Sequence, residues 1–496
     1  MTAPRLLHEL LDDALVAHAD RPAVGTHADR LTYAELAAES RRIAVGLHAL
    51  GVRAGDRVVV AIAPDVLIAA LLYGCSRLGA VFCVFGETAP PPAYAHVFDD
   101  AEPTALITDN PDARELAEQR GIRCLSTRDL RVLGEQKELR TGPIAVDPVC
   151  LIYTSGSTGL PKAVVSTHAQ LTFAVQAIQS QLRYQPNDVV FCALPLSFDY
   201  GLYQLFLATA AGAFVHLADA TDAGPRLLAE LLRTHTTVLP AVPGMARGLA
   251  MMLSRPGAEP PSVRLLTNTG SAMSEGVLAE LRARIPGLGI QLMFGLTECK
   301  RATIMPRDED LRRPGACGRA LPGTEVFAVD GDGNRVPAGE VGELVVRGPN
   351  VMAGYWRRPE LTAQRFPHAE GLFPRLRTGD YGWVDEEGYL YFVGRRDDLY
   401  KERGFRVSAI EVAAAANRID GIDAAAVLPP GDGREEATLV VVGSLASADV
   451  LTALRARIEE YKVPQRCQVV PSMPLTRNGK IDRAALDRLV PDGSRG

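Results

Sequence analysis

The sequence predicts an α/β protein with a large first domain and a small α+β domain at its C-terminal end. Short apolar runs such as 57–62 alternate with helical patterns such as 33–50 and 66–78, which is typical of strand–helix–strand units in parallel sheets. The 496 residues, of which 47% are hydrophobic, can bury a large core and should divide into more than one domain.

The pattern changes towards the C-terminal end. An apolar run over 438–442 predicts a strand, residues 450–461 carry an amphipathic helix pattern, and another strand is predicted near 467–470. Strands and a helix mixed in this way indicate a small α+β domain. We therefore expect two domains, residues 1–396 and 397–496, joined by a short connection.

Composition argues against several classes of function. The formal net charge of −6 and the isoelectric point near 5.9 disfavour nucleic acid or an anionic membrane as the main partner. The most apolar run, 58–74, contains Pro64 and Asp65 and falls short of an uninterrupted membrane span. The N-terminal residues read as an amphipathic helix and not as a secretion signal. We expect a cytoplasmic protein.

One loop points to phosphate binding. Residues 153–162 read Tyr-Thr-Ser-Gly-Ser-Thr-Gly-Leu-Pro-Lys. Glycines adopt backbone angles that are closed to other residues, so several N–H groups can converge on anionic oxygen, and hydroxyls and a lysine add donors and positive charge. The residues predicted to bind phosphate are Thr154, Ser155, Gly156, Ser157, Thr158, Gly159 and Lys162.

The loop is not the P-loop of kinases and ATPases. That motif needs glycine, lysine and a hydroxyl residue in succession, whereas here Leu160 and Pro161 precede the lysine and Ala163 follows it. A polar surface turn between a strand and a helix is the other reading of such a loop.

Five more motifs follow in the chain. They are 294–298 (Phe-Gly-Leu-Thr-Glu), 377–383 (Arg-Thr-Gly-Asp-Tyr-Gly-Trp), 394–398 (Gly-Arg-Arg-Asp-Asp), 401–406 (Lys-Glu-Arg-Gly-Phe-Arg) and 475–481 (Leu-Thr-Arg-Asn-Gly-Lys-Ile). Together and in this order, the loop and the five motifs resemble the signature of the adenylate-forming superfamily, which includes acyl-CoA synthetases, nonribosomal peptide synthetase adenylation domains and luciferases. The resemblance extends over nearly the whole chain.

The resemblance implies a ligase that uses ATP and Mg²⁺. A carboxylate is a poor electrophile until one oxygen joins a leaving group such as AMP, which requires metal, positive charge and a fixed nucleotide. Residues 1–396 would be the AMP-binding domain, with Phe294 and Gly295 at the nucleotide. Glu298 would hold Mg²⁺, which prefers carboxylate oxygen, beside Thr297 at the α-phosphate. Alone, this Thr-Glu pair would indicate a helix start.

Further nucleotide contacts are implied later in the chain. Asp380 would bind both ribose hydroxyls, since one carboxylate can accept two hydrogen bonds, and Arg395 would contact ribose or phosphate. Lys480 would supply positive charge between the attacking carboxylate and the phosphate during adenylation. Without the resemblance, Asp380 would indicate a turn and Lys480 a solvated turn residue.

The small domain carries two functional segments that cannot occupy one site together. In relatives it rotates between half-reactions, presenting first the lysine that Lys480 matches and then the loop that 401–406 matches, where a thiol attacks. The resemblance therefore implies a mobile domain over 397–496 with its hinge at Asp397. An ordinary charged turn is the alternative reading of Asp397.

Asp199 bears on the acid that is activated. It lies in a Phe-Asp-Tyr-Gly segment at 198–201, where simple acyl-CoA synthetases usually carry Phe-His and amino-acid-activating domains carry aspartate. In those domains the aspartate pairs with the substrate ammonium, a charge that is costly to bury alone. Tyr200 and Gly201 replace the usual small residue and serine, so Asp199 could instead bond locally.

Further residues align with the acyl pocket: Tyr200, Tyr203, Pro240, Thr267, Thr269, Met293 and Arg301. Two tyrosines and a methionine leave a compact space, which favours a small or cyclic acid. Phe-Asp-Tyr-Gly combined with Glu-Cys-Lys-Arg at 298–301 resembles freestanding enzymes that load proline onto a carrier protein, and also a group of acyl-CoA ligases. Lys300 or Arg301 could face the carrier, the phosphates or solvent, and solvent is the simplest expectation.

The favoured function is ATP-dependent activation of an amino acid, proline first, and its transfer to the phosphopantetheine thiol of a carrier protein in secondary metabolism such as antibiotic biosynthesis. No carrier domain follows Lys480, so the carrier would act in trans. One alternative is an AMP-forming acyl-CoA ligase for a small carboxylic acid. The other is a nucleotide-binding regulator without catalysis.

Overall fold

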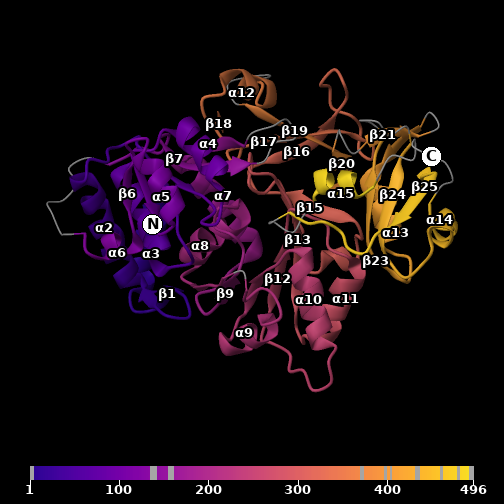
Figure 1. The fold of residues 1–496 in the computed structure, drawn as a ribbon, viewed down its shortest axis with the longest axis horizontal. Helices are drawn as coiled ribbons and strands as arrows, with labels where there is room; N and C mark the ends of the chain where they lie inside the picture. Colours follow the sequence, from indigo (N-terminus) through magenta and orange to yellow (C-terminus); the bar gives the residue numbers. More distant parts are fainter. Residues whose placement is uncertain are drawn as a thin grey trace. The chain divides into compact units, whose positions relative to one another are not determined.

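A computed structural model describes residues 5–133, 142–154, 161–219, 221–368, 374–395, 399–402, 405–430, 436–458, 462–476 and 481–490. Its elements form two compact units. The first contains residues 1–326 and 346–377, and the second contains 327–345 and 378–496. Both units mix helices with sheets (Figure 1), so the predicted α/β class, with a large and a small part, is confirmed.

The first unit contains a seven-stranded sheet. Its spatial order is β18 (Gly354–Tyr355), β8 (Lys162–Thr167), β7 (Pro148–Thr154), β4 (Val81–Val84), β3 (Arg57–Ala61), β5 (Ala105–Thr108) and β6 (Arg123–Leu125). Its centre is parallel, whereas β8 runs antiparallel to both β7 and β18.

A second sheet region of this unit carries several of the residues predicted for the acyl pocket. Its spatial order is β15 (Ala316–Ala320), β14 (Thr303–Ile304), β13 (Gly289–Phe294), β12 (Leu265–Asn268), β11 (Val238–Pro240), β9 (Val189–Cys192), β10 (Phe214–Leu217), β1 (Pro22–Gly25) and β2 (Arg30–Thr32). The strands from β13 to β1 are parallel neighbours, so their carboxyl ends meet at one edge.

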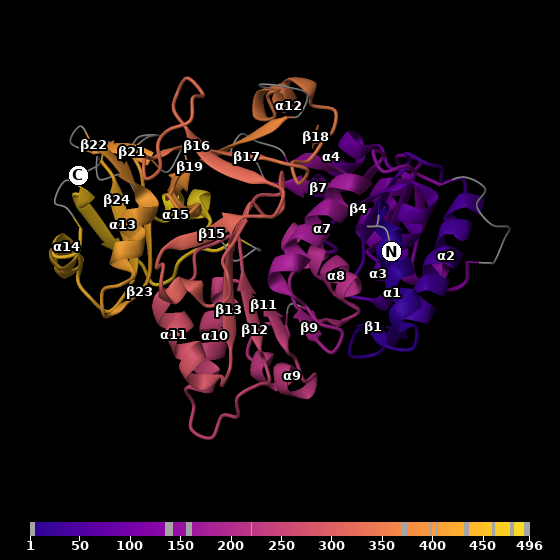
Figure 2. The ribbon, with the colours of Figure 1, turned by 180° about the vertical axis from the view of Figure 1, so that it is seen from behind.

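Helices surround these sheets, and α10 and α11 lie side by side in both views (Figures 1 and 2). The helices of the first unit are α1 (Leu7–His18), α2 (Tyr33–Ala49), α3 (Val66–Leu78), α4 (Pro91–Ala101), α5 (Pro111–Glu118), α6 (Thr127–Arg131), α7 (His168–Leu182), α8 (Asp199–Ala211), α9 (Leu227–Arg233), α10 (Pro243–Leu253), α11 (Glu275–Arg284) and α12 (Pro359–Arg365), with a 3₁₀ turn at Glu309–Leu311.

Helix α3 shows why the sequence pattern was informative. The Asp65 side chain accepts a hydrogen bond from Leu67 N and caps its start, and Gly79 ends it with a φ of +77°. Every residue of α3 except Arg77 is buried, as expected of a helix that is apolar all round. The predicted helix over 66–78 is thus confirmed, with its polar cap residues outside the apolar run.

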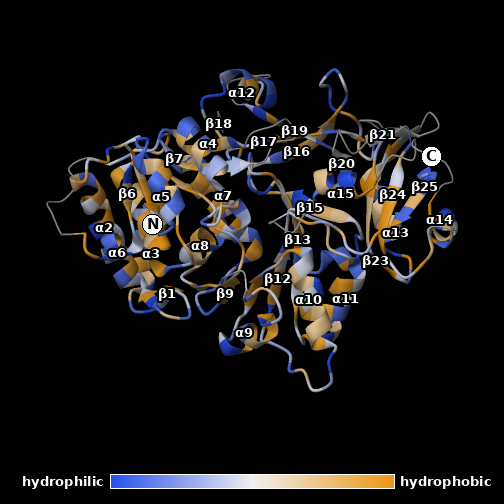
Figure 3. Ribbon diagram, viewed as in Figure 1, coloured by the Kyte–Doolittle hydropathy of each residue, from blue (hydrophilic) through white to orange (hydrophobic). Residues whose placement is uncertain are grey.

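The second unit is smaller. It contains most of β16 (Glu325–Val329), β17 (Gly342–Arg347), β19 (Arg375–Val384) and β20 (Tyr389–Arg395), the pair β21 (Leu399–Glu402) and β22 (Phe405–Ser408), and a three-stranded sheet of β23 (Ile422–Leu428), β24 (Thr438–Gly443) and β25 (Arg466–Val469). Its helices are α13 (Ala409–Ala416), α14 (Ser447–Arg455) and α15 (Arg483–Leu489). The central strand β24 is strongly hydrophobic (Figure 3). Both predicted strands are found, and the helix predicted over 450–461 is found as α14, which ends at Arg455.

The cysteines carry free thiols. All eight cysteines are free, and five of them are buried. Within the described ranges, none of the helices is long and apolar enough to cross a membrane.

Two histidines of the first unit, His168 and His216, are buried, and His8 is partly buried. The ring of His8 contacts Ser76 Oγ, Nδ1 of His168 accepts a hydrogen bond from Leu7 N, and the ring of His216 stacks on Phe191. Burial lowers the pKa of each imidazole to about 4. His168, which starts α7, therefore has a packing role against α1.

These imidazoles should make stability depend on pH. Their folded pKa values lie below the ordinary value of about 6.5, so the unfolded chain binds more protons between about pH 6.5 and 4, and the free energy of unfolding falls as pH falls through that window. Between pH 7.5 and 5.0, we expect the free energy of unfolding of His216→Gln to fall by about 1–2 kcal/mol less than that of the original protein, as measured by urea titrations. The same substitution at exposed His48 is the control. If the free energy of unfolding fell equally steeply with pH in His216→Gln and His48→Gln, this expectation would be contradicted.

Candidate functional site

The phosphate-loop motif lies between β7 and β8. These antiparallel strands place Thr154 opposite Lys162, so the loop leaves and re-enters the sheet at one point. Ser155, Gly156, Ser157, Thr158 and Gly159 lie outside the described residues.

Helix α4 holds both ends of this loop. The Tyr153 hydroxyl donates to Asp100 Oδ2 at 2.8 Å, and His96 Nε2 donates to the carbonyl oxygen of Pro161 at 2.6 Å. Asp100 is buried, and its other oxygen accepts from Arg358 Nη2 at 2.7 Å. A single helix therefore fixes the residues on either side of the candidate phosphate loop, which sequence reasoning missed because α4 precedes the loop by some fifty positions.

Glu298, the predicted metal ligand, lies in a turn after β13. The segment is not the helix start that a Thr-Glu pair alone would indicate, and Thr297 belongs to the same turn. Glu298 is 7% exposed, its Oε1 accepts from the Tyr355 hydroxyl at 2.6 Å, and its carbonyl oxygen accepts from Met352 N. A carboxylate held through one oxygen retains lone pairs on the other, so the donor chemistry fits Mg²⁺.

Lys162 lies near this carboxylate. Its Nζ is 4.1 Å from the centroid of the Tyr355 ring, and the hydroxyl of the same tyrosine contacts Glu298. The structure thus brings together the predicted phosphate-binding lysine and the predicted metal ligand through a residue that carried no signal in the sequence.

The predicted ribose contacts belong to the second unit. Asp380 is buried in β19, where its N–H donates to the Thr378 hydroxyl oxygen, and it pairs across the ladder with Arg395 of β20. The two residues are therefore backbone neighbours, and their predicted ribose role stays a prediction. Asp397 and Lys480 lie outside the described residues.

Asp199 starts α8 and is already paired with a guanidinium. Arg301 Nη1 donates to Asp199 Oδ2 at 2.9 Å, and the side chains are 4% and 5% exposed. The Arg301 guanidinium also lies 4.9 Å from the Tyr200 ring centroid. Asp199 is thus paired with another residue predicted for the acyl pocket, which is distant in the sequence.

Lys300 is fully buried. The expectation that Lys300 and Arg301 face solvent is wrong, since their exposed fractions are 0% and 3%. Lys300 Nζ lies 5.8 Å from the Tyr203 ring centroid and has no hydrogen-bond partner among the described residues. Burial lowers the pKa of its ammonium, and the Asp199 carboxylate opposes that shift.

Most of the other residues predicted for the acyl pocket lie at the carboxyl ends of parallel strands. Pro240 ends β11 beside Thr267 of β12, and the Tyr200 hydroxyl donates to the Thr267 carbonyl oxygen at 2.7 Å. Thr269 follows β12, and Met293 and Phe294 end β13. This edge is where open α/β sheets bind ligands. The structure therefore places the predicted pocket residues on neighbouring elements.

Two glycines let these segments approach closely. A Cβ on Gly295 would lie 2.1 Å from the carbonyl oxygen of Lys300, and a Cβ on Gly201 would lie 2.5 Å from that of Pro195. Gly295 thus lets the turn fold back on β13, and Gly201 lets α8 pack against the segment before Asp199.

The Gly201 contact can be tested by substitution. Gly201→Ala should lower the free energy of unfolding by about 1–3 kcal/mol, because backbone atoms must move to admit the methyl group. Gly248→Ala in α10 is the matched control, because its Cβ would meet only Met252 Cε at 3.8 Å and alanine favours helix by up to about 1 kcal/mol. Denaturant unfolding measures both, and equal effects would contradict the packing argument.

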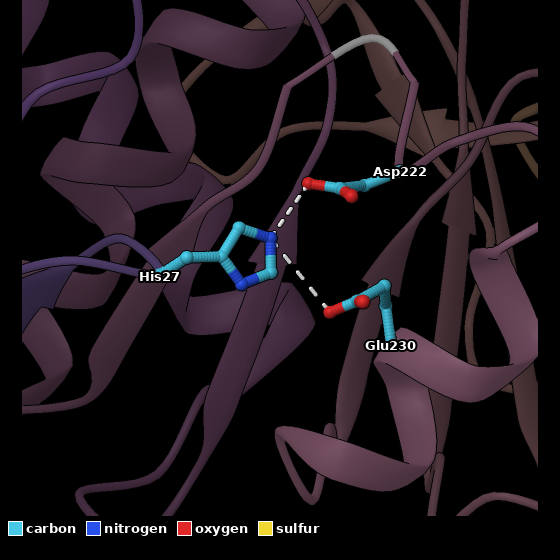
Figure 4. A group of neighbouring side chains, drawn as sticks. All are labelled: His27, Asp222 and Glu230. Carbon is cyan, nitrogen blue, oxygen red and sulfur yellow. Dashed lines mark hydrogen bonds and ion pairs between the residues drawn. The ribbon is translucent and has the colours of Figure 1, made fainter.

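A second group of side chains gathers at His27, Asp222 and Glu230 (Figure 4). His27 Nε2 lies 2.9 Å from Asp222 Oδ2 and 3.7 Å from Glu230 Oε2. Arg233 Nη2 lies 2.6 Å from His27 Nδ1, and because arginine only donates, Nε2 must carry the proton that Asp222 accepts. Arg226 and Arg233 also pair with the carboxylates. The group fits an ion-pair cluster and not a metal centre.

Comparison with known families covers most of the chain. The family model described as AMP-binding enzyme matches residues 11–356, and that described as AMP-binding enzyme C-terminal domain matches residues 411–480.

Individual relatives differ in the acids that their names give. A feruloyl-CoA synthase of an Amycolatopsis species is 32% identical over 92% of this chain and 94% of its own length. An L-proline–[L-prolyl-carrier protein] ligase of Pseudomonas fluorescens is 29% identical over 98% and 99%. The structure of VinN with L-aspartate is 35% identical, with a TM-score of 0.71, over 78% of this chain and 98% of the VinN chain.

Proposed function

Since the chain belongs to the AMP-binding enzyme family and is an AMP-forming acid–thiol ligase, we propose that it activates an amino acid that carries a second carboxylate. The observation that carries this proposal is the Lys300 ammonium, which is fully buried with no hydrogen-bond partner among the described residues. A buried unpaired charge is costly, so the pocket favours a ligand that brings an anion.

The buried charges at residues 199, 300 and 301 support recognition of two groups of the substrate, its ammonium and a second carboxylate. Asp199 contributes one negative charge, and Lys300 and Arg301 contribute two positive charges while Lys300 is protonated. An amino acid with two carboxylates would place its ammonium at Asp199 and its non-reacting carboxylate near Lys300 and Arg301. All three buried charges would then have partners.

The reacting carboxylate suits Lys300 less well. Adenylation converts that carboxylate into a mixed anhydride with the phosphate of AMP and removes its charge. A lysine paired with it would therefore lose its partner during the reaction. A second carboxylate keeps its charge throughout. Lys300 is therefore better matched to the group that does not react.

The relatives are consistent with an amino acid. VinN has been crystallised with L-aspartate, and another relative is named as a proline ligase. Proline, which the sequence favoured, would satisfy Asp199 but bring no second carboxylate to Lys300. We therefore favour an aspartate-like acid over proline, and the phosphopantetheine thiol of a carrier protein as acceptor, in a pathway of secondary metabolism.

A second candidate keeps the chemistry but changes the acid and the acceptor. Asp199 is already neutralised by Arg301, so a small acid without an amine would leave that pair intact and place its carboxylate at Lys300. The acceptor would then be coenzyme A, as the name of the feruloyl-CoA synthase relative indicates for that protein.

The nucleotide roles complete the proposal. AMP-binding enzymes use ATP with Mg²⁺ in general; the metal supplies charge neutralisation at the phosphates. Glu298 would hold the metal, Thr297, Lys162 and the loop at 154–159 the phosphates, and Asp380 and Arg395 the ribose. Lys480 and the hinge at Asp397 would serve adenylation and the rotation of 397–496.

The acid can be identified by pyrophosphate release with hydroxylamine as the trap. The panel contains aspartate, glutamate, proline, ferulate and malonate. We expect aspartate or glutamate to exceed proline, and Lys300→Met to lower kcat/KM for the acidic amino acid by about 100-fold, which corresponds to losing one buried charge contact. Mass spectrometry of a holo carrier protein and of coenzyme A identifies the acceptor.

The same panel separates the candidates. Asp199→Asn should shift preference from aspartate towards malonate, because the amine loses its partner and the carboxylate does not. Lys462→Met, which removes a lysine paired with Glu411 in the second unit, is the control. Activity with proline alone, or a Lys300→Met variant with unchanged preference, would exclude the two-carboxylate substrate.

A further inference from the structure

Tyr355 occupies a position that is fixed from several sides. It belongs to the two-residue strand β18, which pairs with β8 so that Tyr355 lies opposite Val164. Its N–H donates to Thr362 Oγ1 of α12 at 3.0 Å, and its ring packs edge-on against Phe366 at 5.5 Å. Tyr355 is 5% exposed, so both its backbone and its ring are held.

The hydroxyl and the ring of this tyrosine make different contacts. The hydroxyl donates to Glu298 Oε1 at 2.6 Å, which is short, as expected of a hydrogen bond to a charged acceptor. The ring face lies 4.1 Å from Lys162 Nζ, within the range of a cation–π contact. One side chain therefore touches both a candidate metal ligand and a candidate phosphate-binding cation.

We propose that Tyr355 is a positioning residue that sets Glu298 and Lys162 relative to each other for Mg²⁺ and the ATP phosphates. The hydroxyl holds Oε1 of Glu298 and leaves Oε2 for the cation. The ring holds the Lys162 ammonium on the loop side of β8. The proposal rests on the nucleotide site of the proposed function and is independent of which acid is activated.

Two substitutions separate the contacts. Tyr355→Phe removes the hydroxyl and keeps the ring, whereas Tyr355→Leu removes both. Binding of a fluorescent, non-hydrolysable ATP analogue is titrated with Mg²⁺ and, separately, in EDTA. We expect Tyr355→Phe to raise the Mg²⁺ concentration for half-maximal binding by about tenfold and to leave the affinity in EDTA unchanged, as for loss of a group that orients a metal ligand. Tyr355→Leu should also weaken binding in EDTA by about tenfold.

Tyr33→Phe is the matched control. The Tyr33 hydroxyl is buried and donates to the carbonyl oxygen of Ala213 at 2.7 Å, so its removal also costs a buried hydrogen bond, but away from the candidate site. It should lower the melting temperature without changing the Mg²⁺ dependence. A purely structural Tyr355 would behave like Tyr33.

The outcomes are distinct. The proposal would be overturned if Tyr355→Phe kept the Mg²⁺ dependence of the original protein. It would also be overturned if Tyr355→Phe and Tyr355→Leu changed the affinity for the analogue equally, both in EDTA and in Mg²⁺. If the original protein binds the analogue without any response to Mg²⁺, the metal role of Glu298 fails and this proposal fails with it. A failed acid panel alongside the expected Tyr355 results would reject only the substrate assignment.

Discussion

The antiparallel pairing of β7 with β8 is the constraint on which the candidate nucleotide site depends. It places Thr154 opposite Lys162, so the two ends of the loop are neighbours in the sheet. On its other side β8 pairs with β18, so the strand that carries Lys162 also fixes the position of Tyr355 along the neighbouring strand. The antiparallel strand β8 in an otherwise parallel sheet thus brings Lys162 and Tyr355, which are distant in the sequence, close together. A shift of one residue in the pairing of β18 with β8 would turn the Tyr355 side chain to the other face of the sheet.

Buried charge is the second organising feature. The Asp199–Arg301 pair is more than nine-tenths buried on both sides, and removal of either partner would leave an uncompensated charge at a cost of about 3–5 kcal/mol. Such a buried ion pair contributes little to stability, because well-packed apolar residues would fill the space without that cost. Its presence therefore favours a binding role for these residues. Lys300 extends the argument, since protein folding alone gives no reason to bury an ammonium beside Tyr203.

The sequence was informative where physical signals are local. The apolar helical pattern over 66–78 predicted α3, and the strand before the loop at 153–162 was predicted, but the strand β8 between the loop and helix α7 was not. It failed at Lys300, where two successive cations indicate a surface. What buries them is the absence of a Cβ at Gly295, which admits the backbone of the following turn, together with a φ of +62° at Lys300. Tyr355 could not be predicted because its role depends on strand pairing across the fold and not on its neighbours in the chain.

The proposed metal ligand and the proposed acid contacts share one short segment of backbone. Glu298 accepts from Met352 N through its carbonyl oxygen, and the Asn350 side chain donates to the carbonyl oxygens of Cys299 and Arg301. The turn is therefore held from one side by residues just before β18, which also carries Tyr355. In the proposed function, the residues that recognise the acid and the residue that holds the metal therefore share the same backbone support. Selectivity in such a site would be expressed in the rate of adenylation as well as in binding, because the interactions that recognise the acid also place the groups that act on the phosphates.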